Sequence, residues 1–330
     1  MKRQIKALAL TLAAAFGTSV AQAGNPAPVT VRVVTPFATG HILADTALQF
    51  KQELEKRAKH ITVTVQTGVL NEQTINPAMQ SCNPAERVGD IMLTGGQPIQ
   101  DYAPEYFFFN GPYVIRDFHH LQEVWEGKLG DKLVKILETN GKYVAFDPVY
   151  RGFRQFTSNK PINTPADFAG LKLRLPPTPD WIAVWSSLGV APVQVPLTGI
   201  YAALQNGTAE ASEGDLTQIQ SLKLYEVQSH LTLTNHLVGF GMQMANACFF
   251  RNELSKSDQS KVRAALKKAA QWGTRTIQQR ESTLLSQLQA AGMTVVTPDA
   301  AAIRTAAEPA INNLFATKWT VTTWKKVLDE

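Results

Sequence analysis

The segment from residue 29 to residue 68 most restricts how this chain can fold, because it reads as strand, helix and strand with short links. VTVRVVTP (29–36) alternates as a strand does, and ITVTVQTG (61–68) is a second strand ended by glycine. Between them, apolar residues recur at helical steps of four, three and four: Leu43, Ala47, Phe50 and Leu54. Strands joined in this way lie parallel in one sheet, so we expect an α/β protein.

The same kind of pattern recurs through the rest of the chain. Strands are expected at GDIMLTG, KYVAFDPVY, GFRQFTS, LKLRLP and AEASEGD, with a broken helical stretch over 117–141 and a helix at GIYAALQNG. A short helical turn at TPADFAG has Thr164 as its cap and Pro165 at its first position. A chain of 330 residues is long enough for two domains, each with its own core.

The longest expected element is a helix over residues 256–291. Ser255 and Asp258 form a capping pattern at its start, and the apolar periodicity continues to a stop at Gly292. At about 1.5 Å per residue such a helix is about 54 Å long. This length exceeds what one compact domain needs, so the helix either spans two domains or pairs with a partner.

Residues 1–23 have the pattern of a secretory signal peptide. An apolar run at 7–20 is too short to span a bilayer comfortably, and it is followed by A-Q-A and preceded by three positive residues: Lys2, Arg3 and Lys6. The next residue is Gly24 and not cysteine, which argues against a lipoprotein. Removal of the peptide leaves +2 of the formal charge of +5. With no basic run interleaved with aromatics and no later apolar run of about 20 residues, nucleic acid and a membrane span are not expected.

Motifs for catalysis or metal binding are missing from the sequence. It contains no G-x-S-x-G, no G-x-x-x-x-G-K-[ST] and no H-E-x-x-H, and its six histidines form no ligand pair at helical spacing. We therefore expect no enzyme activity, no cofactor and no metal, although a site assembled from distant residues stays open. Cys82 and Cys248 are either a disulfide of an exported protein or buried free thiols.

Two arginines carry the strongest signal for recognition of a charged group. Arg154 lies in GFRQF and Arg174 in LKLRLP, both on expected strands with bulky apolar neighbours. A half-buried guanidinium cannot lose its charge and needs a permanent partner. That partner is either an internal Asp or Glu or the carboxylate of a ligand, which the planar fork can hold by two hydrogen bonds. The residue pattern alone leaves both alternatives open.

Five motifs between residues 150 and 236 resemble those of the solute-binding proteins of TRAP (tripartite ATP-independent periplasmic) transporters, the family of the four-carbon dicarboxylate and sialic acid receptors. In order they are G-x-R-Q, K-P-I-x-T-P-x-D, G-L-K-x-R, Y-x-A-L-Q-x-G and Y-E-V. The resemblance implies two hinged α/β lobes, each a mixed β-sheet flanked by helices, with the long helix packed across both. It assigns 24–150 and about 237–262 to lobe I, and 151–236 and about 263–330 to lobe II.

The resemblance also implies roles for particular residues in the cleft between the lobes. Arg174, the arginine of G-L-K-x-R, is expected to make the main bidentate contact with a ligand carboxylate. Arg154, the arginine of G-x-R-Q, is expected to assist it. Glu213, in the loop after Y-x-A-L-Q-x-G, is expected to brace Arg174. The resemblance thus implies that the carboxylate of Glu213 orients Arg174 and that the carboxylate of the ligand forms the second ion pair with it.

Departures from the family pattern indicate where the ligand is selected. Small residues replace polar or aromatic ones at several places, and apolar side chains lie near the expected pocket. The further candidate ligand contacts are Gly214, Asp215, Gly95, Leu197, Trp181, Phe37 and Gln73. Trp181 and Phe37 could equally be packing residues. The pattern favours a roomier, less hydrophilic pocket than the sialic acid type, for an aromatic or branched hydroxy or keto acid as readily as for a dicarboxylate or sugar acid.

The functional expectation is a monomeric periplasmic receptor that captures an organic acid and delivers it to TRAP membrane subunits. Three alternatives stay open at this point. One is a binding protein that serves a sensor or another type of transporter. Another is a secreted two-domain hydrolase or isomerase with an unrecognised site. The third is a structural protein that dimerises through its long helix.

Overall fold

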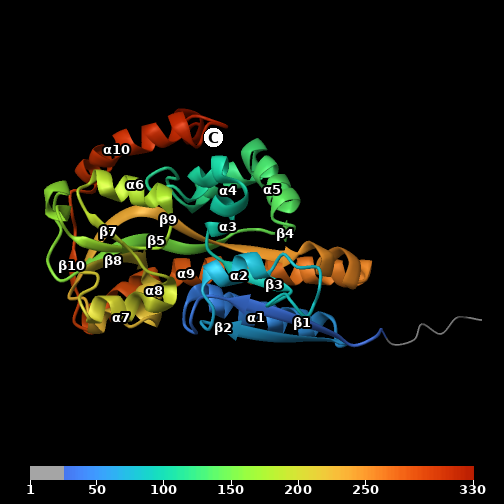
Figure 1. The fold of residues 1–330 in the computed structure, drawn as a ribbon. Helices are drawn as coiled ribbons and strands as arrows, with labels where there is room; N and C mark the ends of the chain where they lie inside the picture. Colours follow the sequence, from blue (N-terminus) through green and yellow to red (C-terminus); the bar gives the residue numbers. More distant parts are fainter. Residues whose placement is uncertain (1–25) are drawn as a thin grey trace, which may run out of the picture.

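The computed structural model describes residues 26–330, so the expected signal peptide at 1–23 lies outside the described residues. Figure 1 shows two groups of strands and helices joined through the middle of the molecule. The strands are β1 Val29–Thr35, β2 Ile61–Thr67, β3 Ile91–Thr94, β4 Tyr143–Ala145, β5 Val149–Ser158, β6 Lys172–Leu175, β7 Ala191–Gln194, β8 Ala211–Asp215, β9 His230–Asn246 and β10 Thr294–Val296. The α-helices are α1 Ile42–Arg57, α2 Glu72–Ala78, α3 Gln97–Tyr102, α4 Phe118–Glu126, α5 Lys128–Asn140, α6 Pro179–Ser187, α7 Ile200–Gln205, α8 Leu216–Ser221, α9 Lys256–Ala290, α10 Ala300–Thr317 and α11 Trp324–Leu328.

The strand–helix–strand pattern at the start of the chain is confirmed. β1 pairs in parallel with β2 along its whole length and with β3 on its other side. Helix α1 buries Phe50 and Leu54 completely, in a core shared with Val31 and Val63 of the two strands. The apolar spacing read from the sequence is therefore the face by which α1 covers the sheet.

Strand β9 joins the two sheets of the molecule. Its last residues pair antiparallel with β3 and β4, and its earlier residues pair with β5 and β10. Beyond β5 the strand order continues through β8 and β6 to β7, with both parallel and antiparallel pairs. The expected class, two lobes that each hold a mixed β-sheet flanked by helices, is confirmed. The lobe boundaries assigned from the sequence stay a prediction.

The expected long helix is α9, which has 35 residues. The Ser255 hydroxyl accepts a hydrogen bond from the backbone N–H of Asp258 at 3.1 Å and so caps its start. Along its length α9 packs against α1 of the first sheet and against β5 and α8 of the second. Gly273 allows the close approach to α1, because a Cβ there would lie 2.3 Å from Thr46 Oγ1. The helix, orange in Figure 1, thus packs across both lobes.

The end of the chain folds back over the second lobe. Helix α10 packs against α6, and α11 returns to α4, where Nε2 of His120 lies 2.6 Å from the carbonyl oxygen of Val327. Figure 1 shows α10 in red above α6, with the C-terminus near α4. In the part of the chain that the structure describes, no helix combines the length and hydropathy of a transmembrane segment.

The two cysteines form a disulfide. Cys82, in the segment after α2, is bonded to Cys248, just after β9, and their Cα atoms lie 5.4 Å apart. That separation is usual for a disulfide. Of the two alternatives that the sequence left open, the structure therefore selects the bonded pair over free thiols. The bond closes a loop with a sequence separation of 166 residues.

Removal of this disulfide is expected to lower the free energy of unfolding by about 2–5 kcal/mol, because a cross-link over a long loop restricts the unfolded chain. The measurement is urea denaturation of the double variant Cys82→Ser, Cys248→Ser beside the oxidised protein. Ligand affinity of the folded variant should be unchanged, since neither cysteine lines the cavity described below. An unfolding midpoint equal to that of the oxidised protein would contradict this prediction.

Candidate ligand-binding site

A narrow cavity lies in the middle of the molecule. It is bounded by β5, β6, α6 and α8 on one side and by α2, α3 and the 3₁₀-helix η1 (Pro104–Asn110) on the other. Its lining residues are Phe37, Glu72, Gly96, Gln97, Asn110, Arg151, Arg154, Arg174, Pro176, Trp181, Leu197, Gln218, Leu237, Gly239 and Phe240. The volume of this cavity is about 20 Å³, little more than the roughly 10–15 Å³ that one water needs. Entry of an organic acid therefore requires the walls to move.

Arg174 reaches the cavity from β6, where the neighbouring Leu173 and Leu175 are fully buried. Its Nε donates to the backbone carbonyl of Val195 at 2.8 Å, and this is the only hydrogen bond that its guanidinium makes within residues 26–330. The residue is 2% exposed, and burial lowers the pKa of Arg174 to about 10, so that it stays charged at neutral pH. Arg174 lines the cavity, and its Nη1 and Nη2 have no hydrogen-bond partner among the described residues, so this buried cation is suited to bind an anion.

The structure corrects the expected role of Glu213, which braces Arg154 and not Arg174. Nε and Nη2 of Arg154 donate to the two carboxylate oxygens of Glu213 at 2.5 and 2.7 Å. The reason is strand register. β8 runs antiparallel to β5 with Glu213 opposite Phe156, which makes Arg154 its diagonal neighbour on the same face. β6 meets β8 only at Leu173, so Arg174 lies beyond this contact.

Glu213 is held ionised by the groups around it. Burial alone would raise its pKa, but the Arg154 charge and a hydrogen bond with His236 Nε2 at 3.2 Å hold the pKa of Glu213 well below its usual range. Burial lowers the pKa of His236, although the neighbouring Glu213 opposes that shift. Its Nδ1 pairs with the Thr234 hydroxyl at 2.8 Å. Arg154 is thus fixed in place, with its guanidinium carbon 5.1 Å from the centre of the Trp181 ring.

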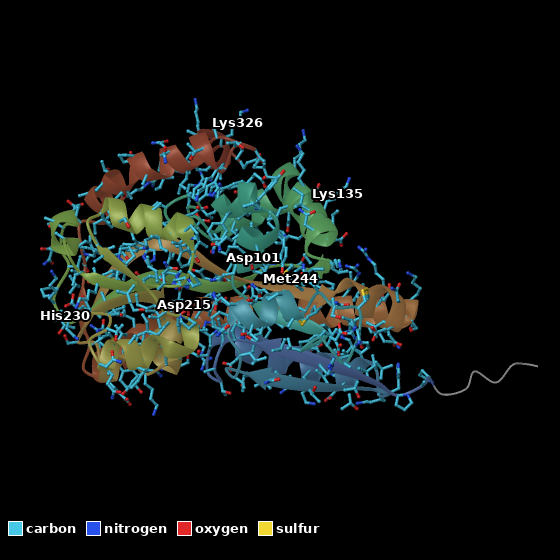
Figure 2. The ribbon with its side chains drawn as sticks, viewed as in Figure 1. Asp101, Lys135, Asp215, His230, Met244 and Lys326 are labelled. Carbon is cyan, nitrogen blue, oxygen red and sulfur yellow. A yellow bond between two sulfur atoms is a disulfide. The ribbon has the colours of Figure 1, made fainter. Side chains whose placement is uncertain are left out.

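A third arginine, Arg151, also lines the cavity and is absent from the sequence-based candidates. Its Nε and Nη2 donate to Asp215 Oδ2 at 3.2 and 2.8 Å, and its guanidinium carbon lies 4.4 Å from the centre of the Phe37 ring. Asp215 is completely buried and also accepts from the Thr217 hydroxyl and the Gln218 backbone, as the cap of α8. Figure 2 labels Asp215 beside α8. Asp215 is therefore a partner of Arg151 and does not line the cavity.

A β-bulge explains why the sequence did not reveal Arg151. Simple strand alternation places residues 151 and 154 on opposite faces of β5. In the structure the register of β5 against β9 shifts between Tyr150 and Gly152, and Gly152 has φ of +90°, which glycine adopts readily. Both arginines consequently reach one cavity. A glycine directly after Arg151, inside a strand pattern, is the one signal that could have predicted this.

The opposite wall, from α2 and α3, carries the polar side chains of Glu72 and Gln97. Glu72 is 6% exposed, and its carboxylate accepts only from the backbone N–H of Gly95, at 3.2 Å, among the described residues. Burial raises the pKa of Glu72, while the Arg151 charge opposes that shift. Gly95 itself does not line the cavity. A Cβ at Gly95 would lie 2.8 Å from Glu72 Oε1 and 2.6 Å from Gln97 Oε1, so glycine allows these two side chains to converge.

Five of the ten sequence-based candidates line the cavity: Arg174, Arg154, Trp181, Leu197 and Phe37. Trp181 is positioned by its indole N–H, which donates to the Asn110 carbonyl at 2.6 Å. Gly214 lies behind the wall, because a Cβ there would lie 2.4 Å from Nε2 of Gln218, which does line the cavity. Gln73 borders neighbouring hollows between the lobes. The lining residues that sequence reasoning missed include Arg151, Glu72, Gln97, Asn110 and Gln218.

Acid is expected to destabilise the protein through the two buried carboxylates. Arg154 and Arg151 lower the pKa values of Glu213 and Asp215 in the folded protein. In the unfolded chain these carboxyls have a pKa of about 4. Above that pH both ion pairs contribute their full stabilisation, and this stabilisation is lost as the pH falls below it. Burial raises the pKa of Glu72, so this carboxyl has the opposite effect on the pH dependence of stability. Urea denaturation between pH 6 and pH 3 should show a shallower decline for Asp215→Asn than for the natural protein. Parallel declines would contradict the assignment.

Two mixed α/β lobes, joined by β9 and enclosing a cavity lined by three arginines, define a two-lobed binding protein. Within residues 26–330 no group of His, Cys, Asp and Glu side chains is arranged to hold a metal ion. The family described as bacterial extracellular solute-binding protein, family 7, matches residues 37–318. The chain therefore belongs to this family, the solute-binding proteins of TRAP transporters, which are receptors and not enzymes.

Similar proteins agree with this assignment. The sialic acid-binding periplasmic protein SiaP of Vibrio cholerae is 32% identical over 198 residues, which are 60% of this chain and 61% of that protein. The matched part thus spans about three fifths of that relative's length. A TRAP periplasmic solute-binding protein from Roseobacter denitrificans, with bound L-galactonate, superposes with a TM-score of 0.81 at 26% identity over 87% of this chain and 94% of its own. A TRAP periplasmic solute-binding protein from Sulfurospirillum deleyianum, with bound succinate, superposes with a TM-score of 0.84 at 23% identity, over 92% of this chain and 99% of its own.

Proposed function

We propose that this protein captures a small organic acid in the periplasm and delivers it to the membrane subunits of a TRAP transporter. The observation that carries the proposal is Arg174, a buried guanidinium that faces the cavity with two nitrogens unpaired among the described residues. A carboxylate that leaves water needs charge-assisted hydrogen bonds in return, and this arginine can supply two of them in parallel. The relatives named above have an acid as their bound or recognised solute.

The other two arginines support Arg174 in this role. Arg154 and Arg151 are each bonded to a buried carboxylate, which leaves the Nη1 atom of each without a partner among the described residues. Both line the cavity beside Arg174. We assign Arg174 as the main contact, Arg154 as the auxiliary contact, and Glu213 and Asp215 as the groups that hold the auxiliary arginines in position. We further propose that the protein acts as a monomer and that the chain crosses between the lobes at 150–151, at 236–237 and, within α9, near 262–263.

A thermal-shift screen of organic acids tests the proposed function. A ligand that binds the folded state stabilises it by RT ln(1 + [L]/Kd), so a tight acid should raise the melting temperature strongly. Titration calorimetry of the best acid should give one site per chain. If no carboxylic acid changes the melting temperature, or if candidate acids are turned over, the proposal is wrong. If the protein binds an acid but a reconstituted TRAP membrane complex does not transport that acid, the protein instead serves a sensor or another type of transporter.

The lobes are expected to close over the ligand. The two walls of the cavity already touch through Trp181 and Asn110, and beside the cavity Nε2 of Gln100 donates to the Pro177 carbonyl at 3.4 Å. A ligand that contacts both walls favours the closed arrangement by its additional contacts. Small-angle X-ray scattering should therefore show a smaller radius of gyration with saturating ligand than without it. An unchanged scattering profile would contradict hinge closure.

A further inference from the structure

We propose that binding of the acid is coupled to the uptake of one proton by Glu72, so that the protein takes up an anion together with a proton. This inference rests on the proposed function, since it concerns the same cavity with a carboxylate bound. It adds a proton-binding site to the cavity, and it does not depend on which acid is the solute.

Two ion pairs cancel most of the charge at the cavity. Of the three arginines that line it, two are bonded to carboxylates of the protein. Arg154 is bonded to Glu213 and Arg151 to Asp215, and all four side chains are almost completely buried. Each pair is neutral, so these four residues present no excess charge to a bound acid.

The remaining charges are those of Arg174 and Glu72, which lie on opposite walls of the cavity. Arg174 comes from β6 and Glu72 from α2, and neither forms an ion pair among the described residues. Within residues 26–330, Glu72 is the only carboxylate among the residues that line the cavity. One cation and one anion are therefore left, and the cavity without an acid has no net charge.

The groups that face Glu72 decide how readily it takes up a proton. Its carboxylate accepts a hydrogen bond from the backbone N–H of Gly95 at 3.2 Å, and no lysine or histidine is among the described residues that line the cavity. Burial raises the pKa of Glu72, and the charges of Arg151, Arg174 and Arg154 oppose that shift. The arginines are thus what keeps this buried carboxyl ionised.

Other titratable groups near the cavity lie behind its walls. His41, at the start of α1, lies 3.5 Å from Asp215 through its Nε2, and burial lowers the pKa of His41 to about 4. His236 contacts the carboxylate that holds the arginine of β5, and burial lowers the pKa of His236 as well. Asp101, in α3, borders a neighbouring hollow. Among the described residues, Glu72 alone is an acid that shares the cavity with the bound carboxylate.

A carboxylate bound to Arg174 upsets the balance of charge. It offsets the charge of Arg174, which helps to keep Glu72 ionised, so the pKa of Glu72 rises further in the complex. Two carboxylates in one buried space would leave an excess negative charge, which is costly away from water. Glu72 therefore takes a proton from the solvent when the acid binds. Its protonated carboxyl then carries an O–H that can donate to an oxygen of the acid.

Proton uptake makes the affinity for the acid depend on pH. Because the pKa of Glu72 is higher in the complex than in the free protein, the complex holds more protons at any pH between the two values. For each proton taken up, the affinity falls about tenfold per pH unit as the pH rises through this range. We expect binding at pH 8.5 to be at least about tenfold weaker than at pH 5.5.

Titration calorimetry in buffers of different ionisation enthalpy measures the uptake directly. The probe is the acid that binds most tightly in the thermal-shift screen, which includes lactate, pyruvate, L-galactonate and succinate. At each pH, the slope of the binding enthalpy against the buffer ionisation enthalpy gives the number of protons taken up. We expect a maximum of at least about 0.5 proton per bound acid between pH 5.5 and pH 8.5, in agreement with the slope of the affinity.

Glu72→Gln has nearly the same shape as the natural side chain but takes up no proton. Its affinity should change by less than about threefold over this pH range, and at pH 8.5 it should bind at least about tenfold more tightly than the natural protein. Protons taken up by the acid itself are common to both proteins, so the difference between them reports Glu72. Asp101→Asn is the matched control, because burial also raises the pKa of Asp101 but this carboxyl lies outside the cavity. It should behave as the natural protein does.

The possible outcomes separate this inference from the proposed function. If the acid binds without proton uptake and with an affinity that does not change with pH, the inference is overturned while the proposed function stands. The same follows if Glu72→Gln takes up as many protons as the natural protein. It also follows if an amino acid binds most tightly without uptake, because its ammonium group then neutralises Glu72.

If no carboxylic acid binds, the inference and the proposed function are both overturned. Proton uptake that disappears in Glu72→Gln and persists in Asp101→Asn supports both. The uptake measured on the natural protein tests the inference even if Glu72→Gln does not fold.

Discussion

Replacement of Arg174 by alanine is expected to weaken binding of the cognate acid by about 30-fold to 4,000-fold. Loss of one member of a buried charged pair costs roughly 2–5 kcal/mol, and each 1.4 kcal/mol is a factor of ten. The expected loss is large because the other cavity arginines already hold carboxylates of the protein. Titration calorimetry with the acid found in the screen is the measurement.

Arg174→Lys is not expected to restore binding, because a lysine ammonium cannot form two parallel hydrogen bonds and loses the bond to the Val195 carbonyl that orients the side chain. Arg57→Ala removes an arginine whose partner, Glu53, lies one helical turn away on the surface of α1. It serves as the control and should leave the affinity unchanged. Near-natural affinity of Arg174→Ala would show that the carboxylate is held elsewhere.

Replacement of Asp215 by asparagine is expected to lower the free energy of unfolding by about 3–5 kcal/mol. The change removes the charge that neutralises Arg151 in a place where both side chains are almost completely buried. An uncompensated buried charge is strongly destabilising, whereas an apolar pair of similar volume is often tolerated. Urea denaturation followed by circular dichroism gives the difference.

A double variant separates the loss of the pair from general damage to the fold. Arg151→Met with Asp215→Leu should recover part of the stability that Asp215→Asn loses, because no charge is left alone. Asp329→Asn, at an exposed position near the C-terminus, should change stability by less than about 0.5 kcal/mol. Equal losses for Asp215→Asn and Asp329→Asn would mean that the Arg151 pair does not stabilise the fold.

Much of the fold could be predicted because its signals are local. The steps between Leu43, Phe50 and Leu54 encode one face of α1, and Ser255 with Asp258 marks the start of α9. The motifs around Arg154 and Arg174 indicated the family to which the chain belongs. Such patterns depend on spacing along a helix or strand, which is a property of the backbone and needs no tertiary contact.

The candidate site was predicted only in part. Both sequence-based arginines line the cavity, but the sequence assigned Glu213 to Arg174, whereas Glu213 is bonded to Arg154. Arg151 was missed because the bulge at Gly152 breaks strand alternation. Glu72 and Gln97 were missed because nothing near them in the sequence shows that Gly95 lets them converge.

The sequence by itself determined the α/β class, the strand–helix–strand start, the long helix and the presence of two arginines suited to a carboxylate. The tertiary structure alone decided which carboxylate holds which arginine, that Cys82 bonds to Cys248, and that Glu72 and Gln97 line the same cavity as the arginines. The physical reason is that the apolar periodicity of a helix or strand depends only on residues that are close together in the chain. Pairing between residues such as Arg154 and Glu213 depends instead on the register of strands that are distant in the chain.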